Sequence, residues 1–428
     1  MAMFYGPNRD TVIGPIEELV DEQRPPIYRN YRYAEFQEEF FRQQGTRRMN
    51  QCNVEIQKKS LHNQLTCQIA LFSFFHLIVF METASIIPSK FILPEDKRPH
   101  LSQVSTLASI PIIDLIDYSE NDDENKDDVP SSLLVEKISQ ACEEYGFFQI
   151  INHGIPEELC NTMMAVTYEF FELPPEERNQ FYTTDHTKQV KLFNYYLNVE
   201  GQDDKVSMWS QCFSHPWHPR ENMTHLLPEN PPQYREVFAE YAKEIGALMS
   251  KLLCLISKGL GLEKDYLEKR LGKNPSLLVQ SNHYPPCPEP ELTLGLAIHT
   301  DLMTALTVLK QSDGVTGLQV IKDGKWMAVD PIPNAFVINL GDQMQVLSNG
   351  RYKSVHHRAV TNKAERRLSM AMFYGPNKDS VIGPIEELLD EQHPPFYRKY
   401  HFSEFVQEFH SQEGTRRMVK EVFELKNK

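Results

Sequence analysis

The stretch SLLVQSNHYPPCPEPELTLGLAIHTDLMTALTVL (276–309) marks the point where long helical patterns give way to short apolar segments separated by Gly, Pro and Asn. The segments that follow have the same strand-like character: LQVIK (318–322), WMAVD (326–330), AFVINL (335–340), SVHHRAV (354–360) and RLSMAMFY (367–374). Short strands bounded by turn residues are typical of a β-sandwich or jelly roll. We therefore predict that this part of the chain forms a jelly roll.

Helices are predicted upstream of these strands. Apolar residues recur at helical spacing over residues 135–145, 156–173 and 231–262. Two short apolar segments, PIIDL (111–115) and FFQIINHG (147–154), are predicted to be strands. The sequence therefore predicts an α+β fold in which helices pack around a double-sheet barrel.

Charge and cysteine usage limit the possible classes of protein. The formal net charge of −15 argues against a nucleic-acid binder, which needs a basic face to neutralise phosphates. The seven cysteines include no C-x-x-C pair, which favours reduced thiols in an intracellular protein. The apolar run from Cys67 to Met81 is shorter than the roughly 20 residues that cross a bilayer. We expect a cytoplasmic monomer without a membrane or nucleic-acid partner.

An internal repeat divides the chain unequally. Residues Met1–Met49 align without a gap with Met370–Met418, and 35 of the 49 positions are identical. Two copies at opposite ends of the chain do not form a solenoid, whose repeats are adjacent. We interpret residues 1–49 as the tail of a related protein joined to the front of a complete one. In this hypothesis Met81 is the natural start and residues 50–80 are a linker that is not native; the alternative is a genuine N-terminal extension.

His299-Thr300-Asp301 is the first candidate for chemistry. In an extended segment, residues two apart point to the same face, so the imidazole and the carboxylate would lie together. A histidine from a distant strand would complete a two-histidine, one-carboxylate set, which favours non-haem Fe(II) and leaves coordination positions open. SVHHRAVTN (354–362) offers His356 and His357 for this position. Alone, H-x-D is a weak signal that more often marks a surface pair.

Two further pairs lie on neighbouring predicted strands. Arg367 and Ser369 are two residues apart, and the planar fork of arginine suits bidentate binding of a carboxylate. The serine hydroxyl could donate to the same carboxylate. Asn282 and Tyr284 share a strand face, and their polar tips could reach the same ligand. The sequence therefore predicts a carboxylate-binding site beside the metal site.

Residues 111–418 resemble plant 2-oxoglutarate/Fe(II)-dependent dioxygenases, and among them the downy-mildew-resistance-type and flavanone-3-hydroxylase-like oxygenases. The N-terminal region of that family is matched by PIIDLIDYS (111–119) and ACEEYGFFQIINHGIP (141–156). Its catalytic region is matched, in the family's order, by residues 281–309, GLQV (317–320), GDQMQVLSNGRYKSVHHRAV (341–360) and RLSMAMFYGP (367–376).

The resemblance implies a double-stranded β-helix (jelly-roll) core flanked by helices, in a single catalytic domain with a non-catalytic N-terminal extension. It assigns iron binding to His299, Asp301 and His357. His357 is preferred to His356 because the family's ligand directly precedes an arginine, here Arg358. Because adjacent strand residues face opposite ways, only one of the two histidines can bind the metal.

The same resemblance assigns roles to the remaining candidates. The R-x-S motif implies that Arg367 and Ser369 bind the C5 carboxylate of 2-oxoglutarate. Asn282 and Tyr284 match secondary contacts with this cosubstrate. Phe373 matches a position that lines the substrate pocket, and Phe193 is a second candidate for that role.

The expected enzyme is an oxidoreductase that uses Fe(II), 2-oxoglutarate and O2, supported by ascorbate, and that releases succinate and CO2. We expect oxidation, with hydroxylation as the first expectation, of a small aromatic specialised metabolite or hormone. One alternative is a catalytically silent small-molecule receptor, although such a protein would not need intact iron ligands. A zinc-type hydrolase would lack an obvious general base.

The predicted division of the chain follows the motifs: an N-terminal copy (1–49), an unassigned linker (50–80), a lead-in (81–110), an N-terminal dioxygenase region (111–220), a helical connection (221–275), the jelly-roll core (276–377) and a C-terminal helical segment (378–428).

Overall fold

The computed structural model describes residues 86–105, 110–116, 132–185, 187–198, 205–219, 221, 223–412 and 419–425, together with two short strands, β1 (Val12–Ile13) and β2 (Tyr31–Arg32). The chain divides into two compact units, Met1–Phe72 and Ser73–Lys428. Apart from β1 and β2, the first copy lies outside the described residues. The apolar run 67–81 and the proposed start at Met81 also lie outside them.

The larger sheet of the second unit has eight strands in the order β3-β4-β14-β11-β16-β9-β8-β5. Its strands are β3 (Ile112–Asp114), β4 (Phe147–Ile151), β14 (Phe336–Leu340), β11 (Leu306–Gln311), β16 (Arg367–Gly375), β9 (Ser276–Tyr284), β8 (Gln211–Pro216) and β5 (Lys191–Phe193). All neighbours are antiparallel except β3 and β4. The central strands are buried on both faces, which explains their nearly continuous apolar sequences.

A smaller sheet faces the larger one and closes the barrel. Its order is β10-β15-β12-β13, from strands β10 (Leu296–His299), β15 (His357–Ala359), β12 (Leu318–Lys322) and β13 (Lys325–Val329). A buried apolar cluster joins Phe147 and Val337 of the larger sheet to Leu318, Val320 and Met327 of the smaller one. Two sheets packed face to face around such a core confirm the predicted jelly roll.

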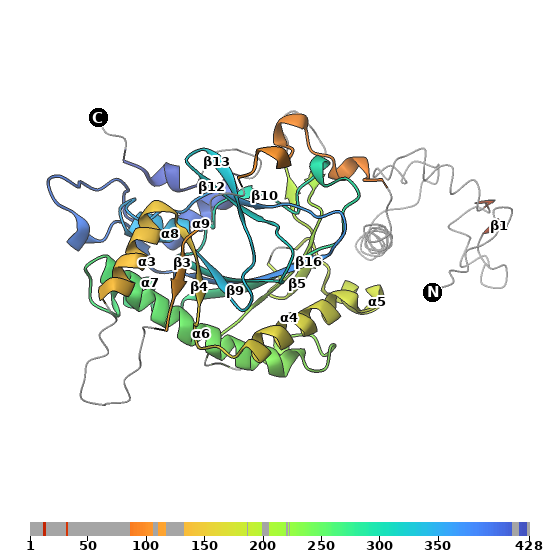
Figure 1. Ribbon diagram of the computed structural model, residues 1–428, viewed down its shortest axis with the longest axis horizontal. Coiled ribbons are helices and arrows are strands. Elements are labelled where there is room, and N and C mark those ends of the chain that lie inside the picture. The colour runs from red at the N-terminus through yellow and green to blue at the C-terminus, as the bar shows by residue number, and fades with distance from the viewer. Residues whose placement is uncertain are drawn as a thin grey trace, which may run out of the picture. The chain divides into compact units, whose positions relative to one another are not determined.

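Helices cover the outer face of the larger sheet. Figure 1 shows α4 (Glu157–Glu172) and the long α6 (Tyr234–Gly259) running along one side of it. α6 also packs against α3 (Ser132–Glu144), and its buried face includes Ile245, Leu252 and Ile256. Shorter helices are α5 (Pro175–Arg178), α7 (Tyr266–Leu271) and α8 (Asp342–Leu347). Among the described residues, no helix is both long and apolar enough to span a membrane.

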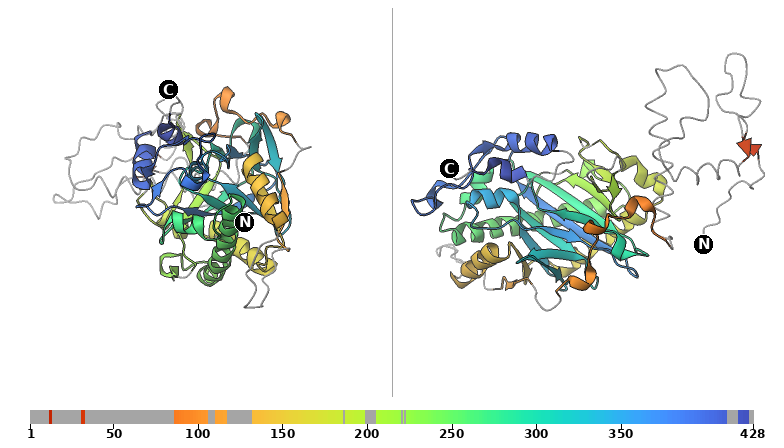
Figure 2. Two further views of the ribbon diagram at one scale, coloured as in Figure 1. Left: turned by 90° about the vertical axis from the view of Figure 1, so that its left-hand side faces the viewer. Right: turned by 90° about the horizontal axis from the view of Figure 1, so that it is seen from above.

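The C-terminal segment, blue in Figures 1 and 2, lies at one end of the barrel. It contains a two-stranded ladder, β17 (Val381–Ile382) with β18 (Tyr400–His401), then α9 (Phe402–Ser411) and the 3-10 helix η10 (Val419–Phe423). Phe405 of α9 stacks on Phe423 of η10, with ring centroids 5.6 Å apart. This segment was predicted as helical, and the ladder is an addition.

The two copies of the repeat share one structural feature. In the first copy Val12 pairs with Arg32 and Ile13 with Tyr31. In the second copy Val381 pairs with His401 and Ile382 with Tyr400, which are the aligned positions in the same register. The two similar sequences therefore form the same local ladder.

The predicted segments correspond closely to the observed ones. The predicted helices 135–145, 156–173 and 231–262 contain or overlap α3, α4 and α6, and the predicted strand 147–154 ends early, at Ile151. The sequence did not reveal β5, β8 or the ladder of β6 (Tyr196–Leu197) with β7 (Val206–Ser207). α8 begins at Asp342, directly after Gly341, and was not among the predicted helices.

Candidate iron and 2-oxoglutarate site

Two neighbouring strands of the smaller sheet bring together the three predicted metal ligands. His299 ends β10 and His357 begins β15, and the two residues are direct partners in this antiparallel pair. Asp301 follows two residues after His299. Its Oδ1 lies 3.9 Å from Nε2 of His299 and 3.6 Å from Nε2 of His357. Among the described residues, this is the group of His, Cys, Asp or Glu side chains whose ligand atoms could share a metal ion.

Hydrogen bonds to the backbone orient both imidazoles. Nδ1 of His299 lies 2.8 Å from the carbonyl oxygen of Ala297, and Nδ1 of His357 lies 3.2 Å from that of Val355. A carbonyl can only accept, so each Nδ1 carries the proton and donates it. The lone pair of each ring therefore lies on Nε2, the atom that faces Asp301. This is the tautomer that a metal-binding histidine requires.

The Asp301 carboxylate is held by two donors on its other oxygen. Thr307 Oγ1 and Asn339 Nδ2 each donate to Oδ2 at 2.6 Å, which leaves Oδ1 for a metal. Burial alone raises the pKa of this carboxyl. The imidazoles of His357 and His299, together with these hydrogen bonds, outweigh burial and hold the Asp301 pKa below its usual value. The carboxylate form is thus the stable one.

His357 is the more deeply placed of the two histidines. Its ring meets Phe147 edge-on, with centroids 5.1 Å apart. Burial, followed by the neighbouring His299, lowers the pKa of His357 to about 4, so the ring stays neutral and able to bind a metal. His356, the alternative candidate, is absent from the metal-binding group. Arg358, used to choose between them, donates to Gln319 at 2.9 Å.

The predicted carboxylate clamp is formed by two paired strands of the larger sheet. Arg367 of β16 is the partner of Tyr284 in β9, and Ser369 is the partner of Asn282. The Arg367 guanidinium lies 4.9 Å from the centre of the Tyr284 ring. A Cβ added to Gly317 would come within 2.7 Å of Arg367 Cδ, so a glycine there leaves room for the arginine.

The polar atoms of this clamp match a carboxylate ligand. Arg367 is buried, and its Nη2 donates to Gln311 at 2.8 Å. Its Nε and Nη1 are buried without a hydrogen-bond partner. Buried donors are rarely left unpaired, because an unpaired donor loses its hydration without gaining a new partner. This loss costs about 1–3 kcal/mol for a neutral group and more for a charged one. A planar guanidinium with two free donor positions fits the distal carboxylate of 2-oxoglutarate.

Strand register places both candidate substrate residues on the clamp's face of the sheet. Phe193 is opposite Cys212, which is opposite Asn282, so these side chains form one row with the clamp. Phe373 lies four residues after Ser369 and is the partner of Thr307, the residue that binds Asp301. Residues directly opposite one another across strands share a face. Both phenylalanines therefore lie on the face of the larger sheet that bears the clamp and Thr307.

Sequence reasoning missed the residues that support this site. Thr307, Asn339 and Gln311 were not identified, although each is a polar side chain in a strand otherwise read as apolar core. Tyr195, between β5 and β6, was given no role from the sequence. Its hydroxyl donates to Gln280 at 2.8 Å and its ring meets Phe193 edge-on, which favours the pocket wall.

Other histidines have structural partners. His153 Nε2 donates to the Asn334 carbonyl oxygen at 2.7 Å, and His153 Nδ1 accepts from Ile155 N–H at 3.1 Å. His153 therefore has a structural role. His215 is buried between the Pro216 carbonyl oxygen and the Tyr234 hydroxyl.

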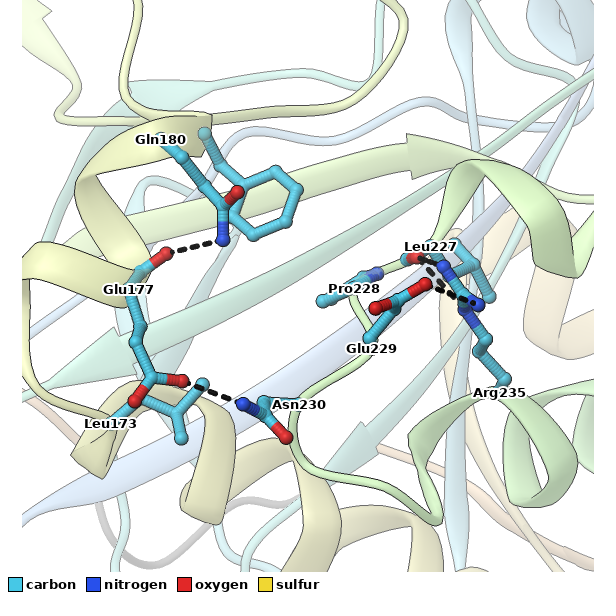
Figure 3. Close-up of a pocket in the computed structure, with 9 residues that line it drawn as sticks. Leu173, Glu177, Gln180, Leu227, Pro228, Glu229, Asn230 and Arg235 are labelled. Carbon is cyan, nitrogen blue, oxygen red and sulfur yellow. Dashed lines mark hydrogen bonds and ion pairs between the residues drawn. The ribbon is translucent and has the colours of Figure 1, made fainter.

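A separate surface cavity of about 330 Å³ lies between α5 and the segment before α6 (Figure 3). Its polar walls are already paired: Asn230 donates to Glu177, and Arg235 donates to the Leu227 carbonyl oxygen. None of the metal-site or clamp residues lines it. This cavity is therefore separate from the metal site and from the clamp.

Comparisons with known proteins agree with this geometry. The family model "2OG-Fe(II) oxygenase superfamily" matches residues 275–376, and "non-haem dioxygenase in morphine synthesis N-terminal" matches residues 110–236. Protein DMR6-LIKE OXYGENASE 1 of Arabidopsis thaliana is 46% identical over 76% of this chain and 89% of its own length. Flavanone 3-dioxygenase 2 of Oryza sativa subsp. japonica is 38% identical, covering 81% of this chain and 97% of its own.

A solved structure supports the same assignment. The crystal structure of JOX2 in complex with 2OG, Fe and JA superposes with a TM-score of 0.70 at 31% identity, covering 83% of this chain and 97% of that one. The comparisons, the jelly roll and the two-histidine, one-carboxylate group agree, and the chain belongs to the 2-oxoglutarate/Fe(II)-dependent oxygenase family.

Proposed function

We propose that this dioxygenase oxidises a small aromatic specialised metabolite or hormone, with hydroxylation as the principal outcome, and releases succinate and CO2. In this proposal His299, Asp301 and His357 bind Fe(II). The observation that carries it is the placement of the three ligand atoms within 4.8 Å of one another, in a barrel whose facing sheet bears a buried arginine with two unpaired nitrogens.

In this proposal, different residues bind the cosubstrate and orient the metal ligands. When bound, Fe(II) supplies O2 activation coupled to decarboxylation of 2-oxoglutarate. Arg367 and Ser369 hold the C5 carboxylate, with Asn282 and Tyr284 beside them. This fixes the orientation of the cosubstrate in the barrel. Hydrogen bonds from Thr307 and Asn339 keep one oxygen of Asp301 directed at the metal.

The proposed substrate class rests on two aromatic side chains and on the relatives. Phe193 and Phe373 are only partly buried, although they lie on the same sheet face as the buried clamp. Aromatic rings with free surface favour a flat apolar substrate. One relative is named a flavanone 3-dioxygenase, and the JOX2 structure contains JA, so the family accepts small organic molecules.

The experiment is a substrate screen of the full chain with Fe(II), 2-oxoglutarate and ascorbate. Succinate and oxidised product are measured over a panel of phenolics and flavonoids, and aliphatic acids of similar size serve as the comparison set. We expect succinate to rise with an aromatic compound. In Phe373→Ala the KM for that compound should rise about tenfold or more, as expected for loss of a buried aromatic contact. Coupled turnover with aliphatic acids alone would contradict the substrate class, and binding of 2-oxoglutarate without turnover of any compound would favour the receptor.

Two further parts of the proposal concern the state of the protein. We propose a monomer in the cytoplasm. Size-exclusion chromatography with light scattering tests the first part, and imaging of a tagged chain tests the second.

A further inference from the structure

The C-terminal 3-10 helix η10 places a lysine in the interior of the catalytic unit. Lys420 is 8% exposed, and its ammonium donates to Oδ1 of Asp342 at 3.0 Å. Asp342, at the start of α8, has no exposed surface. Burying two charges is costly, and removal of one partner leaves the other charge uncompensated. This pair is therefore a strong constraint on where η10 and α8 lie.

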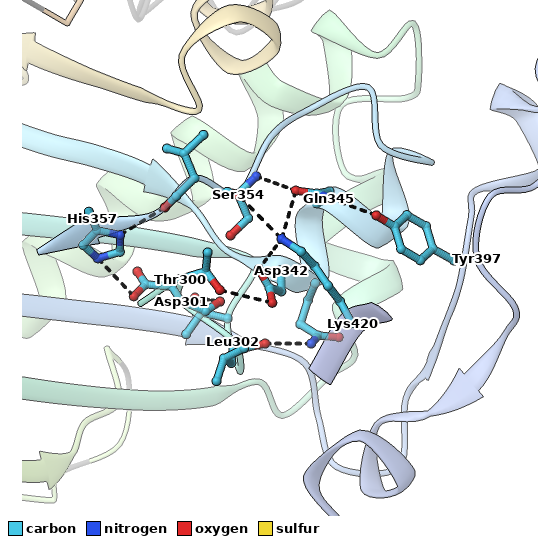
Figure 4. Close-up of polar contacts among 12 residues, drawn as sticks. Thr300, Asp301, Leu302, Asp342, Gln345, Ser354, His357, Tyr397 and Lys420 are labelled. Atoms are coloured by element: carbon cyan, nitrogen blue, oxygen red, sulfur yellow. Dashed lines mark hydrogen bonds and ion pairs between the residues drawn. The ribbon is translucent and has the colours of Figure 1, made fainter. Parts of the chain in front are cut away.

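Asp342 connects the pair to the loop that carries two of the proposed iron ligands (Figure 4). Its other oxygen, Oδ2, accepts from Oγ1 of Thr300 at 3.3 Å, and Thr300 lies between His299 and Asp301. The backbone N–H of Asp342 also donates to the carbonyl oxygen of Asp301 at 2.9 Å. The contact is close, since a Cβ on Gly341 would lie 2.6 Å from that same carbonyl oxygen.

Lys420 also contacts the segment that leads to the third ligand. Its ammonium lies 3.5 Å from the carbonyl oxygen of Ser354, three residues before His357. It donates to Oε1 of Gln345 at 3.2 Å, and that oxygen accepts the N–H of Ser354 at 2.8 Å. In Figure 4 the side chain of Lys420, which extends from η10, lies beside Asp342 and Gln345 of α8 and beside Ser354, in the segment that leads into β15.

We propose that Lys420 is a positioning residue of the iron site. One ammonium group ties together the two separate segments that present the three ligands, through Asp342 on one side and Ser354 on the other. The C-terminal tail thereby sets the ligand geometry without touching the metal. This inference rests on the proposed iron-binding role of His299, Asp301 and His357.

The test measures metal affinity, because a purely structural role would change stability alone. Co(II), which reports its coordination by visible absorption, is titrated anaerobically into the full chain and into Lys420→Met. Loss of groups that orient metal ligands typically weakens metal binding by about 10- to 100-fold. We expect the Co(II) dissociation constant of Lys420→Met to rise by about tenfold or more.

The matched control destabilises the same segment elsewhere. Phe405→Leu removes part of the buried ring packing between α9 and η10. Phe405 is apolar, so it donates no hydrogen bond from its side chain to Asp342 or Ser354. Thermal unfolding of both variants is recorded, and Phe405→Leu should keep Co(II) affinity within about twofold of the wild type, since its ligand supports are intact. An equal loss of affinity in Lys420→Met and Phe405→Leu would overturn the proposal.

A second variant covers the case in which Lys420→Met does not fold. Thr300→Val removes the hydroxyl that links Asp342 to the ligand loop and keeps the side-chain shape. We expect weaker Co(II) binding in Thr300→Val. The loss in the double variant with Lys420→Met should be smaller than the sum of the two single losses, because the two residues share the link through Asp342. Fully additive losses of Co(II) affinity, or unchanged affinity in Thr300→Val, would refute the proposed link from Lys420 through Asp342 to Thr300. Absence of Co(II) binding in the wild type would instead refute the iron site itself.

Discussion

Replacement of Arg367 by methionine tests the clamp directly, because the change removes the guanidinium and keeps an unbranched apolar side chain. Arg367 is buried, and two of its nitrogens have no hydrogen-bond partner. In the proposed complex the guanidinium donates two hydrogen bonds to the C5 carboxylate of 2-oxoglutarate, one from an unpaired nitrogen and one from the second N–H of the adjacent Nη2. Hydrogen bonds to charged groups contribute about 1.5–3 kcal/mol each, so their loss costs at least about 3 kcal/mol.

This free energy corresponds to a rise of about 100-fold or more in the dissociation constant for 2-oxoglutarate. Isothermal titration under anaerobic conditions, with the Fe(II)-loaded full chain, measures the change. In Arg367→Lys the loss should be smaller but present, because an ammonium is a point charge that cannot bind both carboxylate oxygens through a planar fork.

Arg366 provides a matched control one residue away. Its side chain is about half exposed and pairs with Glu172. Because adjacent strand residues face opposite ways, Arg366→Met should leave 2-oxoglutarate binding unchanged. Binding within about threefold of the wild type in Arg367→Met, a change of well under 1.4 kcal/mol, would refute the clamp. An equal loss in Arg366→Met would show a general charge effect.

Three other predictions follow from the structure. Thr307→Val removes one of two donors to Asp301 and should weaken Fe(II) binding by about tenfold in an anaerobic metal titration, whereas unchanged affinity would contradict the orienting role. Burial, with smaller contributions from Arg178 and Arg366, lowers the pKa of His283 to about 3, so the folded chain keeps this ring neutral. The contribution of His283 to the free energy of unfolding is complete above the unfolded pKa near 6.5, and it falls by up to about 1.4 kcal/mol per pH unit as the pH drops toward 3. Urea unfolding at pH 7 and pH 5 should therefore show a smaller loss of stability in His283→Phe than in the wild type. An identical loss in both proteins would contradict the assignment. Deletion of residues 1–80 should leave stability and activity unchanged or improved, and a collapse of solubility in the shortened chain would refute the interpretation of this segment.

The metal ligands could be predicted because strand alternation and the family motif act locally. His299 and Asp301 are two residues apart. Alternation allowed only one of His356 and His357 to bind the metal, and the family resemblance selected His357 by the arginine that follows it. Pairing of β10 with β15 then brings the two histidines opposite one another. The clamp was equally predictable, because Arg367, Ser369, Asn282 and Tyr284 lie on two strands with simple period-two patterns.

The supporting residues required the tertiary structure. Thr307 and Asn339 lie in strands that are predicted from their apolar neighbours, and only the folded sheet shows that their side chains meet Asp301. Asp342 follows a glycine and is typical of a turn in sequence. The buried contact with Lys420 joins residues 78 positions apart, a separation at which no periodicity or spacing rule applies.

The most direct test of the account is succinate formation by the full chain and by two variants of adjacent histidines. The wild type, His356→Ala and His357→Ala are loaded anaerobically with Fe(II) and then given 2-oxoglutarate, O2 and an accepted substrate. We predict succinate from the wild type and from His356→Ala, and none above background from His357→Ala, with all three chains folded by circular dichroism. Succinate from folded His357→Ala at the wild-type rate would contradict the proposed iron site.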